Sequence, residues 1–207
     1  MQLVGILDAE MGNLKSVFNA VYIMGYDAKI ITAEDNFEDL SHLIIPGVGS
    51  FNKVMRLIHH AGLMQKIHLF AASQRPLLGI CLGMQLLADF GVEQGKIDGL
   101  GLIAGKADRL NPGPDLPLPH VGWNSVQFLK GHPVFAGIKT DRDFYFVHSY
   151  NVVCKDRFNV YGITHYGRDF DSIVGKKNII GFQFHPEKSQ TNGLKLIENF
   201  CGWDGRC

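Results

Sequence analysis

The stretch LLGICLGMQLLADF, residues 77–90, consists of a short apolar run, a cysteine between two glycines and a second apolar run. Residues 77–80 are apolar on both sides, which is typical of a parallel strand covered by helices on both faces. The second run, from about Leu82 to Phe90, predicts a helix that follows at once. The pentapeptide GICLG, residues 79–83, therefore lies on a sharp turn from a strand to a helix.

This turn has the form of a nucleophile elbow, in which the middle residue adopts a strained backbone conformation. Flanking glycines remove the Cβ atoms that would collide in such a turn. The Cys81 thiol would lie at the N-terminus of the predicted helix, where the helix dipole and free backbone N–H groups favour the thiolate. Cys81 is thus a candidate nucleophile, although the pentapeptide alone fits a buried cysteine in a glycine-rich turn equally well.

Strand and helix patterns alternate through the N-terminal half of the chain. Apolar runs before the elbow predict three further strands, at 2–7, 28–32 and 42–45. Apolar side chains at helical spacing lie between the strands, at 14–22, 54–58 and 63–70. This alternation indicates an α/β fold with a central, largely parallel sheet flanked by helices and joined by right-handed crossovers.

From Gly91 onward the chain is rich in glycine, proline and turn signals, which predicts a smaller antiparallel sheet or irregular structure. Its best strand patterns lie at 144–148, 151–154, 160–165 and 179–184, and a closing helix is expected around 194–200. Neither a repeat nor a long linker interrupts the chain. We therefore expect one domain over residues 1–207.

Composition excludes several classes of protein. Of the 207 residues, 46% are hydrophobic and only 19% are charged, so the chain is not mainly disordered. Twenty Lys and Arg balance twenty Asp and Glu, so no overall positive field attracts nucleic acid or an anionic membrane. The longest nearly apolar stretch, 77–88, falls well short of the ~20 residues that cross a bilayer.

The N-terminal residues MQLVGILDAE lack the basic start of a signal peptide and already include Asp8, so we expect a cytoplasmic protein. Cysteines occur singly, without a C-x-x-C pair or a nearby histidine at zinc spacing. The sequence therefore predicts neither a metal site nor a disulfide framework. Cys154 and Cys201 are expected to be small buried hydrophobic residues.

A second candidate site is the motif FQFHPE at residues 182–187. Pro186 favours an extended backbone at His185, and residues two apart in an extended chain point to the same side. His185 and Glu187 can then act together, the imidazole moving protons and the carboxylate fixing its tautomer. A histidine after a strand is more often a surface or core residue, but a candidate nucleophile elsewhere favours the catalytic interpretation.

The third motif is the glycine turn PGVGS at residues 46–50, which follows a predicted strand. By itself it is simply a loop. A thiol hydrolase, however, needs two preorganised N–H donors for the tetrahedral oxyanion. The backbone N–H groups of Val48 and Leu82 are the natural pair.

Together these motifs resemble a known family. PGVGSF (46–51), GICLGMQLL (79–87) and GFQFHPEKS (181–189), in this order, resemble the class I (triad) glutamine amidotransferases. With PHVGWN (119–124) and YFVHSY (145–150), the chain is similar to the branch of glutaminase subunits that serves histidine biosynthesis. The resemblance runs from the first strand to the last helix and implies a flavodoxin-like amidotransferase domain.

The resemblance also implies a chemistry. A Cys81, His185 and Glu187 triad would release ammonia from glutamine through a glutamyl thioester, with no cofactor and no metal. A (β/α)₈ barrel cyclase subunit, bound as a heterodimer, would receive the ammonia. The remaining implied site residues bind substrate, namely Gly49, Gln85, His148, Ser149 and Tyr150. Those implied at the partner interface are Asn13, His120, Trp123 and Lys188. An exposed tryptophan in a loop is unfavourable unless a partner covers it, which supports an interface at Trp123.

One departure leaves the ammonia acceptor open. The loop 8–14 reads DAEMGNL, whereas the family usually has tyrosine and glycine in place of Ala9 and Glu10. This loop faces the partner in relatives, so a paralogous subunit that supplies ammonia for surface-sugar biosynthesis is an alternative. A free-standing cysteine hydrolase acting on peptides or γ-glutamyl compounds is another, against which Trp123 argues. The intact triad argues against a catalytically idle binding subunit.

Overall fold

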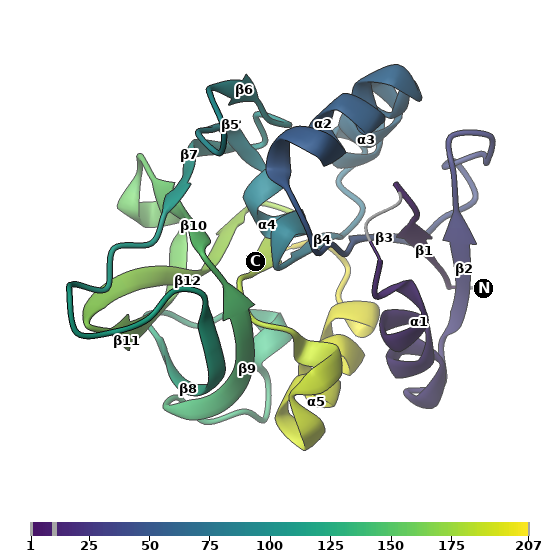
Figure 1. Cartoon of the computed structure of the whole chain (residues 1–207). Coiled ribbons are helices and arrows are strands. Elements are labelled where there is room, and N and C mark those ends of the chain that lie inside the picture. Colours follow the sequence, from purple (N-terminus) through teal and green to yellow (C-terminus); the bar gives the residue numbers. More distant parts are fainter. Residues whose placement is uncertain (1, 10–11, 207) are drawn as a thin grey trace.

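A computed structural model describes residues 2–9 and 12–206 of the chain, and its large sheet is built around the strand before Cys81 (Figure 1). In sheet order, its strands are β2 (Asp27–Ile31), β1 (Leu3–Leu7), β3 (His42–Ile45), β4 (Leu77–Ile80), β13 (Ile179–Phe182), β12 (Arg168–Lys176), β11 (Val160–Tyr166), β8 (His120–Phe128) and β9 (Arg142–His148). The strands from β2 to β13 pair in parallel, in the order typical of flavodoxin-like folds. The predicted fold class is confirmed.

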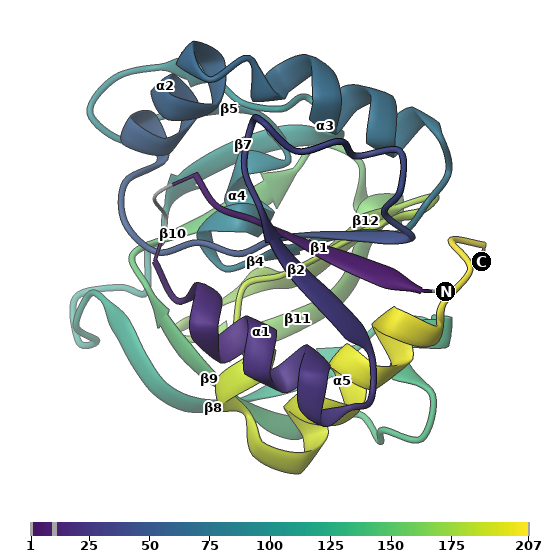
Figure 2. The same ribbon diagram turned by 90° about the vertical axis from the view of Figure 1, so that its right-hand side faces the viewer.

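Helices cover both faces of this sheet (Figure 2). α1 (Leu14–Ile23) and α5 (Gln190–Gly202) pack on one face, where their apolar residues join the core cluster that contains Phe182 and Phe184. α2 (Phe51–His60) and α3 (Leu63–Ala72) pack on the other face. The two helices separate at Gly62, whose φ of +68° suits glycine.

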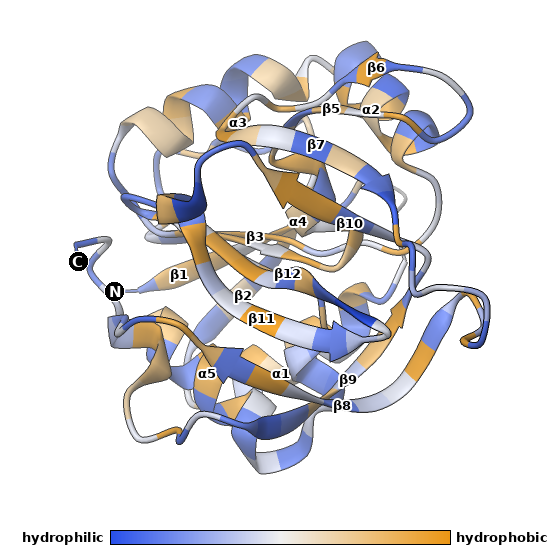
Figure 3. Cartoon of the chain, turned by 90° about the vertical axis from the view of Figure 1, so that its left-hand side faces the viewer, coloured by the Kyte–Doolittle hydropathy of each residue, from blue (hydrophilic) through white to orange (hydrophobic). Residues whose placement is uncertain are grey.

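The smaller sheet lies on the same side as α2 and α3, above the antiparallel half of the large sheet (Figure 3). Its strands are, in order, β10 (Tyr150–Cys154), β7 (Ile103–Arg109), β5 (Ala88–Gly91) and β6 (Ile97–Asp98). It is mixed, because β5 and β7 pair in parallel while the other two pairs are antiparallel.

The helix after Cys81 is shorter than the sequence predicts. α4 spans Leu82–Leu86, and the residues that follow form β5 instead of continuing the helix to Phe90. The physical reason is competition for carbonyl groups. The N–H of Leu100 donates to Leu86 O at 2.8 Å, and that of Ile103 donates to Leu87 O at 2.9 Å. These carbonyls are therefore unavailable to a further helical turn.

In the second half, the strands predicted around 144–148, 151–154 and 160–165 are present as β9, β10 and β11. The strand predicted at 179–184 ends at Phe182 and runs parallel to β4, so it belongs to the parallel part. The sequence interpretation missed β7, β8 and β12. Trp123 consequently lies on strand β8 rather than in a loop.

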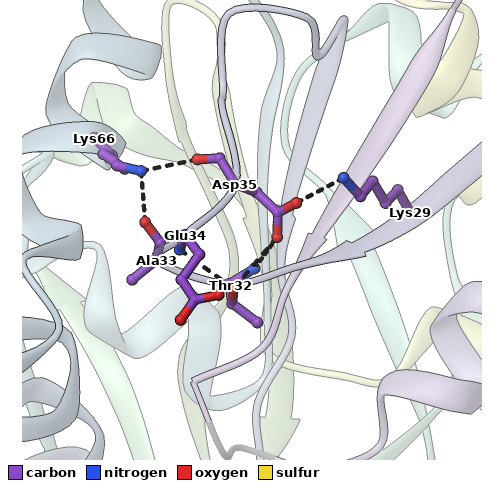
Figure 4. A network of polar contacts seen from close by, with 6 residues as sticks. All are labelled: Lys29, Thr32, Ala33, Glu34, Asp35 and Lys66. Atoms are coloured by element: carbon purple, nitrogen blue, oxygen red, sulfur yellow. Dashed lines mark hydrogen bonds and ion pairs between the residues drawn. The ribbon is translucent and has the colours of Figure 1, made fainter.

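The loop after β2 is fixed by a polar network between β2 and α3 (Figure 4). The Asp35 carboxylate accepts from Lys29 Nζ at 2.6 Å and from the Thr32 N–H at 2.8 Å. Lys66 of α3 donates to the carbonyl oxygens of Ala33 and Asp35. The network therefore holds the loop after β2 against α3.

Across residues 2–9 and 12–206, no helix combines the length and apolar character needed to cross a membrane.

Candidate active site

Cys81 adopts the strained backbone that the elbow predicts, with φ of 54° and ψ of −109°. A Cβ on Gly79 would lie 2.6 Å from Gly83 O, and one on Gly83 would lie 1.7 Å from Ile45 O. Both glycines are therefore sterically required, because any side chain would force the turn away from the strand beneath it. The thiol is held in place with 5% of the residue exposed.

Because α4 is short, its dipole stabilises a Cys81 thiolate less than the sequence predicts. A five-residue helix aligns few peptide dipoles, so the dipole behind Cys81 is weaker than a helix reaching Phe90 would provide. In this structure the N–H of Leu82, one of the predicted oxyanion donors, donates to Gly47 O at 3.3 Å. The Gly47 carbonyl therefore occupies the position next to Cys81 at which an oxyanion would be bound.

A cavity of about 300 Å³ opens above Cys81. Its lining includes every residue predicted to bind substrate or to form the oxyanion hole, namely Val48, Gly49, Leu82, Gln85, His148, Ser149 and Tyr150. These residues come from three separate places in the fold: the turn after β3, helix α4, and the end of β9 with the start of β10. The sequence motifs that contribute these residues are thus brought together around one cysteine.

His185 follows β13, the parallel neighbour of β4, and its Nδ1 lies 2.7 Å from Glu187 Oε1. The two side chains meet because residues 186–188 form a 3₁₀ turn, and not because the chain is extended through Glu187 as predicted. Both side chains are fully buried. Although burial lowers the pKa of His185, its interactions with Cys81 and Glu187 outweigh it and raise that pKa. A raised pKa favours the imidazolium form that a neighbouring thiolate needs.

Asn13 contacts this pair directly. Its side-chain amide donates to the same Glu187 Oε1 that faces His185, so Asn13 lies inside the site as well as on the loop 8–14. Of the two positions at which loop 8–14 differs from the usual family sequence, Ala9 is described, whereas Glu10 lies outside the described residues. His185 Nε2 is buried and has no hydrogen-bond partner among the described residues. It is therefore the ring nitrogen left to exchange a proton with Cys81.

Two polar side chains of the site were not singled out from the sequence. Gln183 is fully buried, and its Nε2 lies 3.8 Å from Cys81 Sγ while its Oε1 accepts from Gln85 Nε2 at 3.2 Å. Glu93 lines the cavity, and its carboxylate accepts the Phe51 N–H at the start of α2 at 2.8 Å. Gln183 lies within the motif FQFHPE, so the sequence could have indicated it. No sequence motif around Glu93 indicates a functional role.

The residues predicted at a partner interface divide into two groups. Trp123 is 48% exposed and packs edge-to-face on Tyr145, over whose ring Lys188 Nζ lies at 5.8 Å. Tyr145 was missed, yet its carbonyl accepts the His185 N–H at 2.8 Å. His120, in contrast, is only 3% exposed and points inward. The His120 side chain therefore faces the core, as the even positions of β8 do, and a role of this residue at a partner interface stays a prediction.

Cys154 and Cys201 are buried, unpaired thiols, as predicted. Burial raises the pKa of each to about 12, so neither competes with Cys81 as a nucleophile. In the part of the chain that the structure describes, no three His, Cys, Asp or Glu side chains are grouped as a metal site requires.

A parallel sheet with a cysteine elbow after one strand and a His–Glu pair after its neighbour defines a glutamine amidotransferase of the triad class. The family model of class-I glutamine amidotransferases matches residues 5–202, and the chain belongs to this family. Two solved structures share the fold: PurLQS from Thermotoga maritima, at a TM-score of 0.77 and 18% identity over 97% of this chain and 98% of the other, and a glutamine amidotransferase, at 0.71 and 21% over 97% and 99%.

Within the family, the chain is similar to proteins named imidazole glycerol phosphate synthase subunit HisH. The protein of that name from Sulfurimonas denitrificans is 45% identical over 96% of this chain and 97% of its own length. The one from Methanocaldococcus jannaschii is also 45% identical, over 96% and 98%. In each comparison, the similarity thus covers nearly the full length of both sequences.

Proposed function

We propose that this chain is the glutaminase subunit of an imidazole glycerol phosphate synthase and that Cys81, His185 and Glu187 are its catalytic triad. The observation that carries the proposal is the position of Cys81, strained at the elbow, under a cavity and beside the buried His185–Glu187 pair. The nearly full-length similarity to HisH subunits supports the assignment to histidine biosynthesis. We expect this enzyme in the cytoplasm.

The first half of the reaction forms a thioester. The Cys81 thiolate attacks the side-chain carboxamide carbon of glutamine, and the carbonyl oxygen becomes a tetrahedral oxyanion. The His185 imidazolium then donates its Nε2 proton to the departing nitrogen, so the C–N bond breaks and ammonia leaves. Glu187, bonded to Nδ1, stabilises the imidazolium and holds the ring toward Cys81.

The second half regenerates the enzyme. Neutral His185 takes a proton from a water molecule as that water attacks the thioester carbon. The C–S bond breaks, glutamate leaves, and Cys81 with His185 returns to the thiolate–imidazolium pair. Neither half requires a redox step or a metal.

The cavity lining fits an α-amino acid. Glu93 places a carboxylate in the lining, where it would neutralise the α-ammonium group of glutamine. Backbone groups of residues 148–150, which also line the cavity, would receive the α-carboxylate. Gln85 lies one helical turn beyond Cys81 and would contact the substrate between these ends.

The proposed oxyanion hole would be blocked while Gly47 O accepts the Leu82 N–H, and one rotation would open it. Gly47 O and Val48 N belong to the same peptide plane, and Gly47 O now accepts the Leu82 N–H at 3.3 Å. Turning this plane would remove the carbonyl and bring the Val48 N–H to the oxyanion. Gly49, with φ of +113°, provides the flexibility next to it. Losing one such donor slows related reactions ~10² to 10³-fold, which sets the size of the effect.

A partner would control this rotation and receive the ammonia. Exposed Trp123 and Lys188 flank the half-buried Tyr145, whose carbonyl accepts the His185 N–H, and this grouping supports an interface there. The partner is a (β/α)₈ barrel cyclase that uses ammonia to make imidazole glycerol phosphate and AICAR. Ammonia released into neutral water is mostly protonated and loses its nucleophilicity, so slow hydrolysis is expected until an acceptor is bound.

The test is glutamate production by the subunit alone, with the barrel subunit, and with the barrel plus its substrate. We expect the rate to rise stepwise, with the largest increase on adding the substrate. Equal rates in the three conditions would contradict the coupling and would favour a free-standing hydrolase. Activation by a barrel paralogue from surface-sugar biosynthesis, and none by the cyclase, would contradict the histidine pathway.

A further inference from the structure

A continuous series of hydrogen bonds runs from strand β11 to the cavity through two histidines that the mechanism does not use. Asn124 Nδ2 donates to His165 O at 2.9 Å and lies 3.2 Å from His120 Nε2. His120 Nδ1 lies 3.0 Å from His148 Nε2, and His148 Nδ1 lies 2.9 Å from Tyr150 O. His120 and His148 are direct register partners on the antiparallel strands β8 and β9, so the contact between their rings joins two neighbouring strands.

The direction of every bond follows from the acceptor at one end. The Tyr150 carbonyl can only accept, so His148 Nδ1 carries a proton and its Nε2 is an acceptor when the ring is neutral. His120 must then donate from Nδ1, which leaves its Nε2 to accept from Asn124. The Asn124 amide fits this direction, since its Oδ1 accepts the Ser125 N–H at 2.8 Å.

Burial keeps both rings neutral. Burial lowers the pKa of His120 to about 4 and that of His148 to about 3. The Tyr166 ring stacks on His120 with 4.0 Å between ring centroids, which closes that side of the pair. Neutral rings have one donor and one acceptor each, which is what the series of bonds requires.

The same Tyr150 carbonyl also fixes Gln85. Gln85 Nε2 donates to Tyr150 O at 2.8 Å and to Gln183 Oε1 at 3.2 Å, so both amide hydrogens are engaged. Gln85 can therefore offer only its Oε1, an acceptor, to a ligand in the cavity that it lines. An N–H of bound glutamine satisfies that acceptor, whereas a carboxylate in the same place would be repelled.

We propose that His120 and His148 are positioning residues that hold the Tyr150 carbonyl so that Gln85 turns its Oε1 toward an N–H group of bound glutamine. His148 acts on the carbonyl directly, and His120 acts by fixing the tautomer of His148. The inference rests on the proposed glutaminase function.

The test compares variants that keep or remove the Nδ1 donor. His148→Phe keeps an aromatic ring and loses the donor, while His148→Asn places an amide N–H at the position of Nδ1. We expect His148→Phe to raise the KM for glutamine about tenfold with little change in kcat, since a substrate hydrogen bond is misplaced. His148→Asn should return KM to within about threefold of the wild-type value. His120→Phe and His120→Asn form a second pair with the same expected order.

Two controls separate positioning from packing. Alkylation of Cys81 by iodoacetamide, which does not need Gln85, should proceed at the wild-type rate in all four variants. His132→Asn changes a buried histidine elsewhere and should leave KM unchanged. A wild-type KM in both Phe variants would overturn the proposal, and so would equal damage in the Phe and Asn members of each pair. If Cys81→Ala retained activity, the proposed function would fail instead, which is a distinguishable result.

Discussion

At the residue scale, one oxygen atom organises the buried pair beside Cys81. Glu187 Oε1 accepts from both His185 and Asn13, so the carboxylate is held from two sides and the imidazole is held through it. In the proposed mechanism His185 transfers protons, whereas Glu187 orients and stabilises the imidazole. The two residues should therefore differ in how much their loss costs.

We predict that His185→Ala lowers the rate of glutamine hydrolysis nearly as much as Cys81→Ala, since members of a triad act as a unit. Glu187→Gln retains an acceptor for Nδ1 but loses the charge. Its loss of rate should be roughly one to two orders of magnitude smaller than that of His185→Ala. Steady-state glutamate production in the activated complex measures both. A Glu187→Gln variant slower than His185→Ala would contradict the orienting role.

The sequence indicated the three proposed triad residues more readily than the side chains that contact them. Cys81 and His185 follow short strands within recognisable motifs, so their local context is informative. Glu93 reaches the cavity from a loop, and Gln183 acts through a contact with Cys81 across two strands. Such contacts depend on the packing of distant segments, which a local pattern does not contain.

At the element scale, adjacent strands explain why three motifs meet. β3, β4 and β13 are parallel neighbours, and the turn 46–50, Cys81 and His185 each follow the carboxyl end of one of them. Alternating patterns predicted β3 and β4 in a parallel sheet, because buried parallel strands are distinctive apolar runs, but they placed β13 in the antiparallel half of the chain. The β5 strand was mistaken for helix because the N–H groups that bind the carbonyls of Leu86 and Leu87 come from residues 100–103. These residues lie far along the chain from the elbow.

A histidine at the start of a 3₁₀ turn predicts how stability depends on pH. His132 Nδ1 accepts the Val134 N–H at 3.1 Å, and burial, aided by Lys130, lowers the pKa of His132 to about 4. Below its ordinary pKa of ~6.5 the unfolded chain binds a proton that the folded chain does not. His132 therefore contributes a loss of stability as the pH falls from ~6.5 toward 4.

We predict that His132→Asn reduces this loss, because asparagine keeps a cap acceptor and does not titrate. The variant should be less stable than the wild type at pH 7, since the ring packing on Trp203 is lost. Between pH 7 and pH 4.5, however, its urea midpoint should fall less than that of the wild type. Parallel slopes for the two proteins would show that His132 does not titrate as inferred.

At the scale of the whole molecule, the site lies close to an exposed aromatic group. Trp123 and Tyr145 lie on β8 and β9, and the Tyr145 carbonyl accepts the His185 N–H. A partner that covers this group would thus contact β9, the strand whose Tyr145 carbonyl is hydrogen-bonded to the proposed catalytic histidine.

We predict that Trp123→Ala weakens binding of the barrel subunit by at least about tenfold, as expected of a buried aromatic anchor. Glutamate production by the isolated subunit should be unchanged. Leu69→Ala, at an exposed apolar position on α3, is the matched control and should leave binding intact. Titration calorimetry of the two variants against the barrel measures the difference, and equal affinities would place the interface elsewhere.

The central claim is that Cys81 releases ammonia for a reaction carried out on a partner. It is tested most directly by forming the complex with the Cys81→Ala variant and assaying synthesis of imidazole glycerol phosphate with glutamine or with ammonium salt. We predict no synthesis from glutamine and near wild-type synthesis from ammonium, because only the nucleophile is removed. Glutamine-dependent synthesis by this variant would contradict the account.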